Sequence, residues 1–123
     1  MLGNFVDYDV LRTLQEIGGD DPLFLSSILD IFLKEAPREL AKMQSALDQR
    51  DAVAVGLIAH RLRSGAQNVG ANRMVQLCLE LDERGRAGQS IGLVELMNDL
   101  IREFKVVETY LRKILETGQI PQD

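Results

Sequence analysis

The stretch LVELMNDLIREFKVVETYLRKILE, residues 93–116, carries the clearest structural pattern in the chain. Its apolar residues return at spacings of three and four, as they do along one face of an α-helix. These residues are Leu93, Leu96, Met97, Leu100, Ile101, Phe104, Val107, Leu111, Ile114 and Leu115. The pattern predicts one long amphipathic helix from about Ile91 to Glu116, and its apolar face must be covered by other elements.

Two more helices are predicted before residue 51. A short apolar series ends at residues 18–19, both glycine, which allow the chain to leave a helix. A longer series spans residues 24–47, and the dipeptide Asp21-Pro22 is typical of a helix cap followed by the first helical position. Because proline lacks the amide donor that a helix interior needs, Pro37 predicts a kink or a restart near Glu35–Ala36.

Two further helices are predicted between residues 51 and 90. Asp51 is expected to cap the first, which ends at Gly70, a residue suited to the left-handed position after a helix. Asn72 is expected to cap the next, and residues 85–90 end it. The residues of this helix that are expected to face inward are Met74, Val75, Leu77, Cys78 and Leu81.

No segment shows the strict alternation of a half-buried strand, so the predicted fold class is all-α. Four long amphipathic helices joined by short loops pack most simply as an antiparallel up-down-up-down four-helix bundle. The short first helix is expected to lie across one end of the bundle as a lid. A chain of 123 residues suits a single domain, predicted over residues 1–118, with a frayed polar tail at residues 119–123.

The composition and charge of the chain exclude several classes of function. The net charge of −5 argues against a nucleic-acid partner, and no uncharged stretch approaches the length of a bilayer span. Cys78 is the only cysteine, so no internal disulfide forms. Asp7 and Asp9 lie where a secretory signal would be basic and then apolar. We therefore expect a cytoplasmic protein that contacts neither a membrane nor nucleic acid. A monomer is expected as well, because exposed docking helices of this kind do not require a dimer.

The charges are distributed unevenly along the chain. Residues 52–79 contain no aspartate or glutamate, although the chain is acidic overall. The same stretch contains the only histidine, His60, and three arginines, Arg61, Arg63 and Arg73. A chance fluctuation on a solvated helix face is one explanation, since charge patterning alone is weak evidence. A positive patch around His60 is the functional alternative.

The residues one helical turn from His60 are small or basic. Gly56 and Ser64 lie four residues before and after it, so little bulk covers the imidazole. A glycine inside a helix costs about 1 kcal/mol relative to alanine, and this helix contains both Gly56 and Gly65. We interpret the two glycines as clearance for the close approach of another protein.

The residue types in this segment are suited to accepting a phosphoryl group. A neutral imidazole nitrogen is a competent nucleophile, and Arg63, one turn from His60, can reach a phosphoryl group on the ring. Arg61 adds to the positive field, and a nearby carboxylate would repel the phosphate. A lone histidine is nevertheless often a plain surface residue, so its position alone does not establish this function.

Two segments carry a family resemblance. Residues 59–71, AHRLRSGAQNVGA, resemble the signature A-H-x-L-K-G-S-x-x-x-x-G-A of histidine-containing phosphotransfer (HPt) domains. Residues 74–82, MVQLCLELD, are similar to the family segment L-x-x-L-C-x-x-L-E. Arg63 stands where the family usually has lysine, and Ser64-Gly65 inverts the usual Gly-Ser order. The inversion puts a bulkier residue first, which could change receiver preference or transfer rate.

The resemblance implies a function. HPt domains accept a phosphoryl group from the aspartate of a response-regulator receiver domain and pass it to another receiver, without kinase activity or bound nucleotide. His60 would be the phosphoacceptor, and Arg63 and Gln67 would steady the phosphoryl group. The partners would be receiver domains, a hybrid sensor kinase, or both. The chain would be a phosphocarrier without a cofactor, with Mg²⁺ only on the receiver. The expected receiver-docking residues are Gly56, Leu57, Arg61, Ser64 and Gly65.

Other interpretations of His60 have less support in the sequence. In the dimerisation helix of a sensor kinase an acidic residue follows the histidine, whereas Arg61 follows it here. One histidine and Cys78, eighteen positions away, do not supply a metal site or a cysteine–histidine catalytic pair. The strongest alternative is a helical interaction module that docks a receiver or another signalling protein without transferring phosphate.

Overall fold

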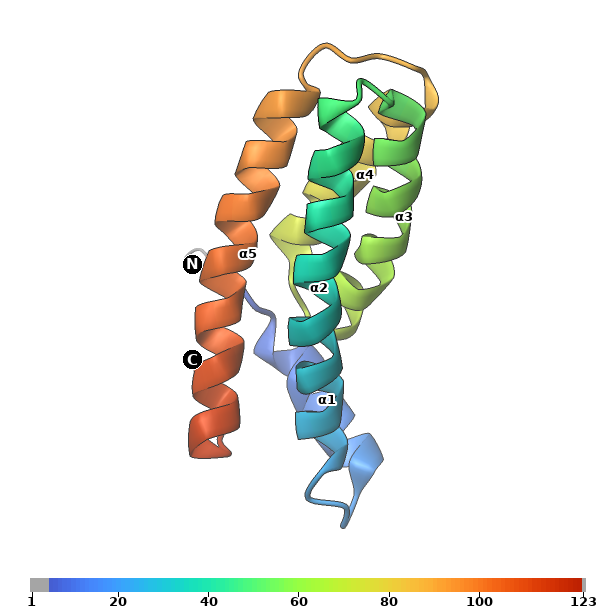
Figure 1. The fold of residues 1–123 in the computed structure, drawn as a ribbon. Helices are drawn as coiled ribbons and strands as arrows, with labels where there is room; N and C mark the ends of the chain where they lie inside the picture. Colours follow the sequence, from blue (N-terminus) through green and yellow to red (C-terminus); the bar gives the residue numbers. More distant parts are fainter. Residues whose placement is uncertain (1–4, 123) are drawn as a thin grey trace.

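All regular structure in the computed structural model, which describes residues 5–122, is helical. Its helices are α1 (Tyr8–Gly18), α2 (Phe24–Asp48), α3 (Ala52–Asn68), α4 (Asn72–Arg86) and α5 (Leu93–Thr117). Figure 1 shows α2 to α5 running alternately up and down, side by side. The predicted all-α, up-down-up-down bundle is therefore confirmed. No helix in the described part of the chain combines the length and apolarity needed to cross a membrane.

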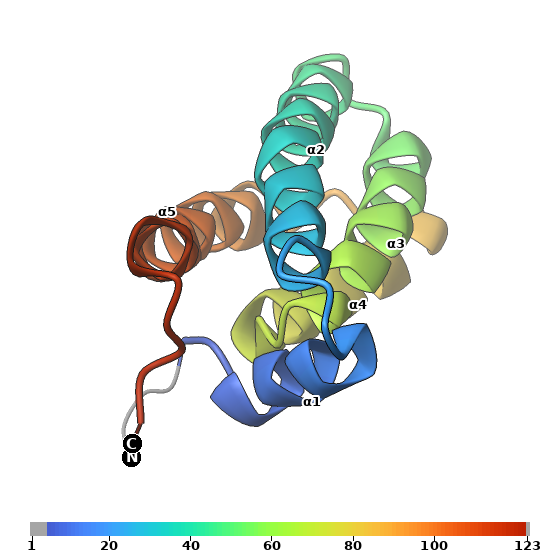
Figure 2. The same cartoon turned by 90° about the horizontal axis from the view of Figure 1, so that it is seen from below.

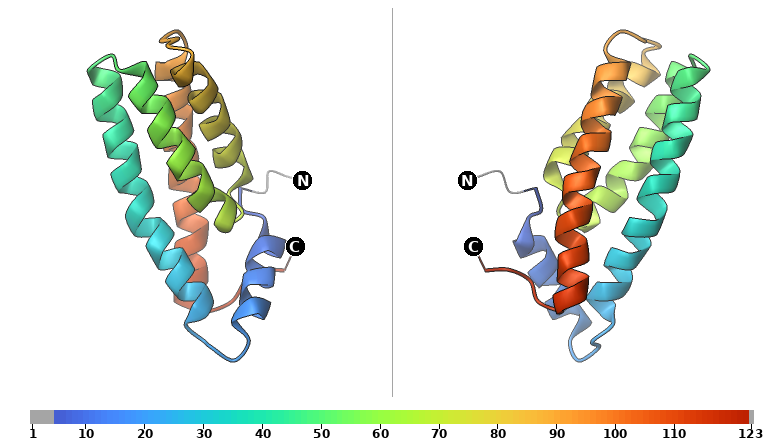
Figure 3. Two further views of the ribbon diagram at one scale, coloured as in Figure 1. Left: turned by 90° about the vertical axis from the view of Figure 1, so that its right-hand side faces the viewer. Right: turned by 60° about the vertical axis from the view of Figure 1, so that its left-hand side comes forward.

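The unequal lengths of the helices explain the position of α1. α2 and α5 have 25 residues each, whereas α3 has 17 and α4 has 15. α1 lies below the shorter pair, as the view from below and the side views show (Figures 2 and 3). The Asp7 amide donates to the Gly70 carbonyl at 2.8 Å, and Leu11 of α1 is fully buried. The prediction of a short helix across one end is confirmed.

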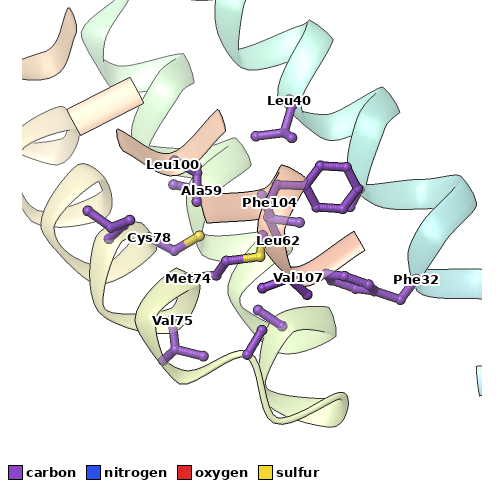
Figure 4. Close-up of a cluster of buried hydrophobic side chains, with 14 of the residues drawn as sticks. Phe32, Leu40, Ala59, Leu62, Met74, Val75, Cys78, Leu100, Phe104 and Val107 are labelled. Carbon is purple, nitrogen blue, oxygen red and sulfur yellow. The ribbon is translucent and has the colours of Figure 1, made fainter. Parts of the chain in front are cut away.

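The core is formed by the inward faces of α2 to α5. Figure 4 shows its centre, where Met74 and Cys78 of α4 direct their sulfur atoms into the cluster. Phe32 of α2 and Phe104 of α5 meet there with their ring centroids 6.0 Å apart. Burial raises the pKa of the Cys78 thiol to about 12, so the thiol stays protonated and acts as a small apolar side chain. The predicted inward residues of α4 are all buried.

Three local predictions about the helices are wrong. α2 begins at Phe24 instead of Pro22, because the Asp21 carboxylate accepts from the Leu23 amide at 2.9 Å and forms a turn. Of the kink or restart predicted at Pro37, the restart is wrong, because α2 continues through the proline. Its apolar face is buried in the same core on both sides of the proline, which offsets the missing hydrogen bond. Asn72 is the first residue of α4 and not its cap.

The other predicted helix ends agree with the structure. The Asp51 carboxylate accepts from the Ala54 amide at 3.1 Å and caps α3, and Gly70 follows α3 with a φ of 73°. Residues 119–122, however, do not form a free tail. Ile120 packs against the core, and Arg12 donates to the Pro121 carbonyl at 2.7 Å. The ends of the predicted domain and tail, residues 1–4 and 123, lie outside the described residues.

Candidate functional site

His60 lies on the surface of α3 beside α4. The apolar residues Val55, Ile58 and Leu62 turn toward the core, so the helical repeat places His60 on the border of the buried face. Its side chain is 46% exposed. The predicted accessibility of the imidazole is therefore correct.

The two helices beside His60 approach each other through glycine. A Cβ on Gly56 would lie 3.1 Å from the Asp82 carbonyl oxygen and from Gly85 Cα. A Cβ on Gly85 would lie 2.5 Å from the Ala52 carbonyl oxygen. Backbone therefore packs directly on backbone where α3 meets α4. The docking role predicted for Gly56 is wrong, because this residue is buried under α4 and its absent side chain permits the close packing.

This close packing brings two residues of α4 to the imidazole. Asp82 Oδ2 lies 3.2 Å from His60 Nδ1, and Asp82 Oδ1 accepts from Arg86 Nε at 2.6 Å. Arg86 Nη2 lies 3.4 Å from the same Nδ1 atom. Within residues 5–122, His60 Nε2 has no hydrogen-bond partner. One ring nitrogen is thus engaged by α4, and the other is available.

The carboxylate-free surroundings predicted for His60 are therefore wrong. The sequence places no acid within the same helix, but Asp82 reaches the ring from 22 residues further along. Sequence reasoning missed both Asp82 and Arg86 as site residues. A signal was present, since Asp82 ends the second family-like segment and Arg86 lies one helical turn beyond it. The ion pair with Arg86 offsets the negative charge of Asp82.

Arg63 lies on the α4 side of α3, close enough for its charge to act on Cys78. Its Nε is buried and has no hydrogen-bond partner among residues 5–122, and the side chain forms no ion pair there. Its charge acts on Cys78 of α4, where it lowers the pKa of the thiol against the larger effect of burial. Its charge is therefore not consumed by an ion pair and remains available to an anion at this edge of α3.

The other predicted residues lie on the outer face of α3 or beyond it. Leu57 and Ser64 are exposed, and Arg61 pairs across to Glu39 of α2 at 3.4 Å. Gln67 is exposed too, but seven residues from His60 correspond to about 10 Å along the helix axis. The structure therefore brings Leu57, Arg61 and Ser64 to the face that carries His60, and it places Gln67 two turns away.

A groove separates α2 from the outer face of α3. Its volume is about 270 Å³, and its lining is largely apolar, with Glu35, Glu39 and Arg61 as its charged members. Gly65 is half-buried in it, and a Cβ there would lie 3.3 Å from the ring of Phe32. Ile31 of α2 also lines it, with 62% of its surface exposed. We refer to this feature as the α2–α3 groove.

The described part of the chain contains no set of side chains that could bind a metal ion. Nowhere in residues 5–122 do three histidine, cysteine, aspartate or glutamate side chains converge as ligands. His60 and Asp82 supply only two donors, and Arg86 lies against both of them.

A helical bundle that presents an exposed histidine on one of its helices is the arrangement that the sequence resemblance implies. The family model described as "Hpt domain" matches residues 27–116. The chain belongs to the Hpt domain family. Histidine phosphotransfer in a phosphorelay, the function predicted from the sequence, is thereby confirmed at the level of the family, whose members are phosphocarriers.

Similar proteins agree with this assignment of the Hpt domain. Histidine-containing phosphotransfer protein 2 of Arabidopsis thaliana is 30% identical over 120 residues, which cover 89% of this chain and 76% of that protein. The crystal structure of histidine-containing phosphotransfer protein B from Pseudomonas aeruginosa is 29% identical, with a TM-score of 0.83 over 91% of this chain and 95% of that one. The virulence sensor protein BvgS of Bordetella pertussis is 29% identical over 99 residues, or 79% of this chain and 8% of that protein.

Proposed function

We propose that His60 is the phosphoacceptor of this Hpt domain. It takes a phosphoryl group from the aspartate of a receiver domain and passes it to a second receiver. The observation that supports this most is the asymmetry of the ring on a 46% exposed side chain. α4 engages Nδ1, while Nε2 has no hydrogen-bond partner among residues 5–122. A nucleophile needs such an accessible lone pair, and the arrangement provides it without a base or a metal on this chain.

Positive charge around His60 supports the same reaction. The transition state of phosphoryl transfer spreads negative charge over three equatorial oxygens, so electrostatic stabilisation is a large part of catalysis. Arg63 has no ion pair among the described residues, and Arg86 extends past Asp82 to the imidazole. We assign the phosphoryl-stabilising role to Arg63 and Arg86, while Gln67, two turns away, suits contact with the partner protein.

The receiver docks on the outer face of α3 and on the α2–α3 groove. Leu57 is 50% exposed, and Ile31 adds a second apolar side chain across the groove. Arg61 and Glu39 form the charged rim of this surface. The receiver contributes its own Mg²⁺ and acidic pocket, so this chain needs no cofactor and no kinase activity. A cytoplasmic monomer suffices for this role, because a single chain carries the whole site.

Transfer of label from a phosphorylated receiver tests the role of His60. Purified receiver domains are phosphorylated with [³²P]acetyl phosphate, freed from it and mixed with the chain. We expect acid-labile, alkali-stable label on the wild type and none on His60→Gln. ATP labelled at the γ position should label neither protein, because the chain lacks kinase activity.

A second variant tests whether any surface histidine would react. His60→Gln combined with Gln76→His places an exposed imidazole on α4, away from Asp82 and Arg86. We expect no label on this double variant. Equal labelling of the double variant and the wild type would contradict a built site at His60. Stable receiver binding without any label on the wild type would favour the interaction module that transfers no phosphate.

A further inference from the structure

The residues that follow α5 run from its end toward α1 (Figure 2). Gly118 has a φ of 71°, and its amide donates back into the last turn of α5 at 2.8 Å, so the chain turns away from the helix axis. Ile120 then packs against the core, and Arg12 Nη2 of α1 donates to the Pro121 carbonyl at 2.7 Å. We refer to residues 118–122 as the C-terminal strap.

The strap crosses a gap between two helices. A cleft of about 800 Å³ separates α1 from the end of α5, with Arg12 and Gln15 lining it from α1 and Lys113 from α5. Because the cleft keeps the two helices apart here, the strap connects them. The Arg12 guanidinium is held in position for this contact, since its Nη1 also donates to Asp9 Oδ1 at 2.7 Å.

α1 depends on its packing contacts for its helical structure. It has 11 residues, and an isolated helix of this length is not stable in water. Leu11 is its one buried residue, whereas each of α2 to α5 buries at least six. The release of α1 therefore costs much less free energy than unfolding the bundle, so α1 can open separately.

α1 joins the two helices that form the walls of the α2–α3 groove. At its start, the Asp7 amide donates to the Gly70 carbonyl, and a Cβ on Gly70 would lie 2.6 Å from the Asp7 carbonyl oxygen. At its end, a Cβ on Gly18 would lie 2.6 Å from the Cβ of Phe24, where α2 begins. Gly70 directly follows Val69, which lines the groove. α1 thus connects the end of one wall to the start of the other.

We propose that the C-terminal strap holds α1 against the bundle, and that α1 in turn holds the two walls of the α2–α3 groove together. When the strap is released, α1 and the strap open as one unit, while α2 to α5 stay folded and His60 stays in place. The groove then loses its support without a change at the imidazole. The effect on docking rests on the proposed function, because it requires a receiver in the groove, whereas the contact between strap and α1 does not.

Hydrogen–deuterium exchange of the intact wild-type chain tests whether α1 opens separately. We expect the amides of α1 to exchange at least about tenfold faster than the amides at the centre of α4, because α1 opens without the rest of the bundle. Equal exchange rates in α1 and α4 would show that α1 opens only when the whole chain unfolds. That result would overturn the proposal.

Substitutions test whether the strap holds α1. Ile120→Ser, far from α1 in the sequence, removes an apolar contact and should accelerate exchange throughout α1 about tenfold, with no change in α4. Arg12→Ala should do the same and should also accelerate exchange of the Gly118 amide. Alanine favours a helix more than arginine does, so this result would not come from the helix itself.

A matched control distinguishes the strap contact from the composition of the cleft. Lys113→Ala removes a cation from the same cleft and should leave exchange in α1 unchanged. Wild-type exchange in α1 of the Ile120→Ser variant would overturn the proposal. Faster exchange in both α1 and α4 of this variant would do so as well, because the strap would then stabilise the whole bundle instead of α1.

A purified, unphosphorylated receiver domain tests whether α1 supports the groove. A partner that binds the closed form more tightly than the open form slows opening by the ratio of the two affinities. We expect a saturating receiver to slow exchange about fivefold in both α1 and the strap, since they open together. A bound receiver that leaves both unchanged would overturn the role of α1 in the groove. Slower exchange without any labelling of His60 would contradict the proposed function alone.

Discussion

α3 forms two unlike boundaries within one bundle. Against α4 it places Gly56 on Gly85, so backbone meets backbone and no space remains. Against α2 it places Gly65 opposite the ring of Phe32, beside a groove of about 270 Å³. The same residue type, with the same cost in helix propensity, closes one boundary and leaves the other open. A glycine in a helix therefore indicates a close approach, but not what approaches.

The ion pairs on the two boundaries differ in the same way. On the closed side, Asp82 and Arg86 belong to one helix and both reach the imidazole of His60. On the open side, Glu39 and Arg61 join two helices at the rim of the groove. The closed boundary thus sets the geometry of the reacting ring, while the open one presents a surface. Substitutions on each boundary test this division.

The largest effect is expected when a side chain is added at the tightly packed boundary between α3 and α4. Gly85→Ala places a methyl group 2.5 Å from a backbone oxygen that cannot turn aside. Such overpacking costs about 3 kcal/mol, less about 1 kcal/mol gained in helix propensity. We expect the free energy of unfolding to fall by about 2 kcal/mol in urea denaturation.

The matched change on the open boundary is Gly65→Ala. Its methyl group would lie 3.3 Å from the Phe32 ring, which can shift by a few tenths of an ångström into the groove. The free energy of unfolding should stay within about 0.5 kcal/mol of the wild type, because the gain in helix propensity offsets the contact. Equal losses for the two variants would show that the boundaries do not differ in tightness.

The next largest effect is expected to distinguish Arg86, on the closed boundary, from Arg61, on the open one. Arg86→Ala leaves Asp82 without its ion pair beside His60 and removes positive charge from the incoming phosphoryl group. We expect the single-turnover rate of transfer from a phosphorylated receiver to fall about tenfold. Arg61→Ala, on the rim, should change that rate less than about twofold and act instead on the receiver concentration for half-maximal rate. A larger loss of rate for Arg61→Ala than for Arg86→Ala would show that the positive charge that assists transfer lies on the open boundary.

The smallest effect concerns the surface of the groove. Ile31→Ser should raise the receiver concentration for half-maximal transfer about fivefold, the equivalent of about 1 kcal/mol of lost apolar contact. The saturated rate should not change. Ile17→Ser is the control, since Ile17 on α1 is as exposed, at 67% against 62%, and lies outside the groove. A similar response to both changes would exclude the groove as the docking surface.

Local sequence signals predicted most of the fold and only part of the site. The helices followed from the spacing of apolar residues, because a helix face depends only on residues three and four apart. The start of α2, its continuity at Pro37 and the cap of α4 were predicted wrongly, since burial by other helices outweighs local preferences there. His60 was found, but its partners Asp82 and Arg86 were not.

The sequence by itself determined that His60 would lie at the edge of a helix face, accessible and followed by arginines. That result depends on the helical repeat alone, which any local stretch of chain encodes. Only the tertiary structure decided that the carboxylate of Asp82 and the guanidinium of Arg86 would contact the imidazole. It also decided that Gly56 would be buried while Gly65 lines a groove. These facts depend on how closely two helices cross, and that distance is set by the packing of residues more than twenty positions apart.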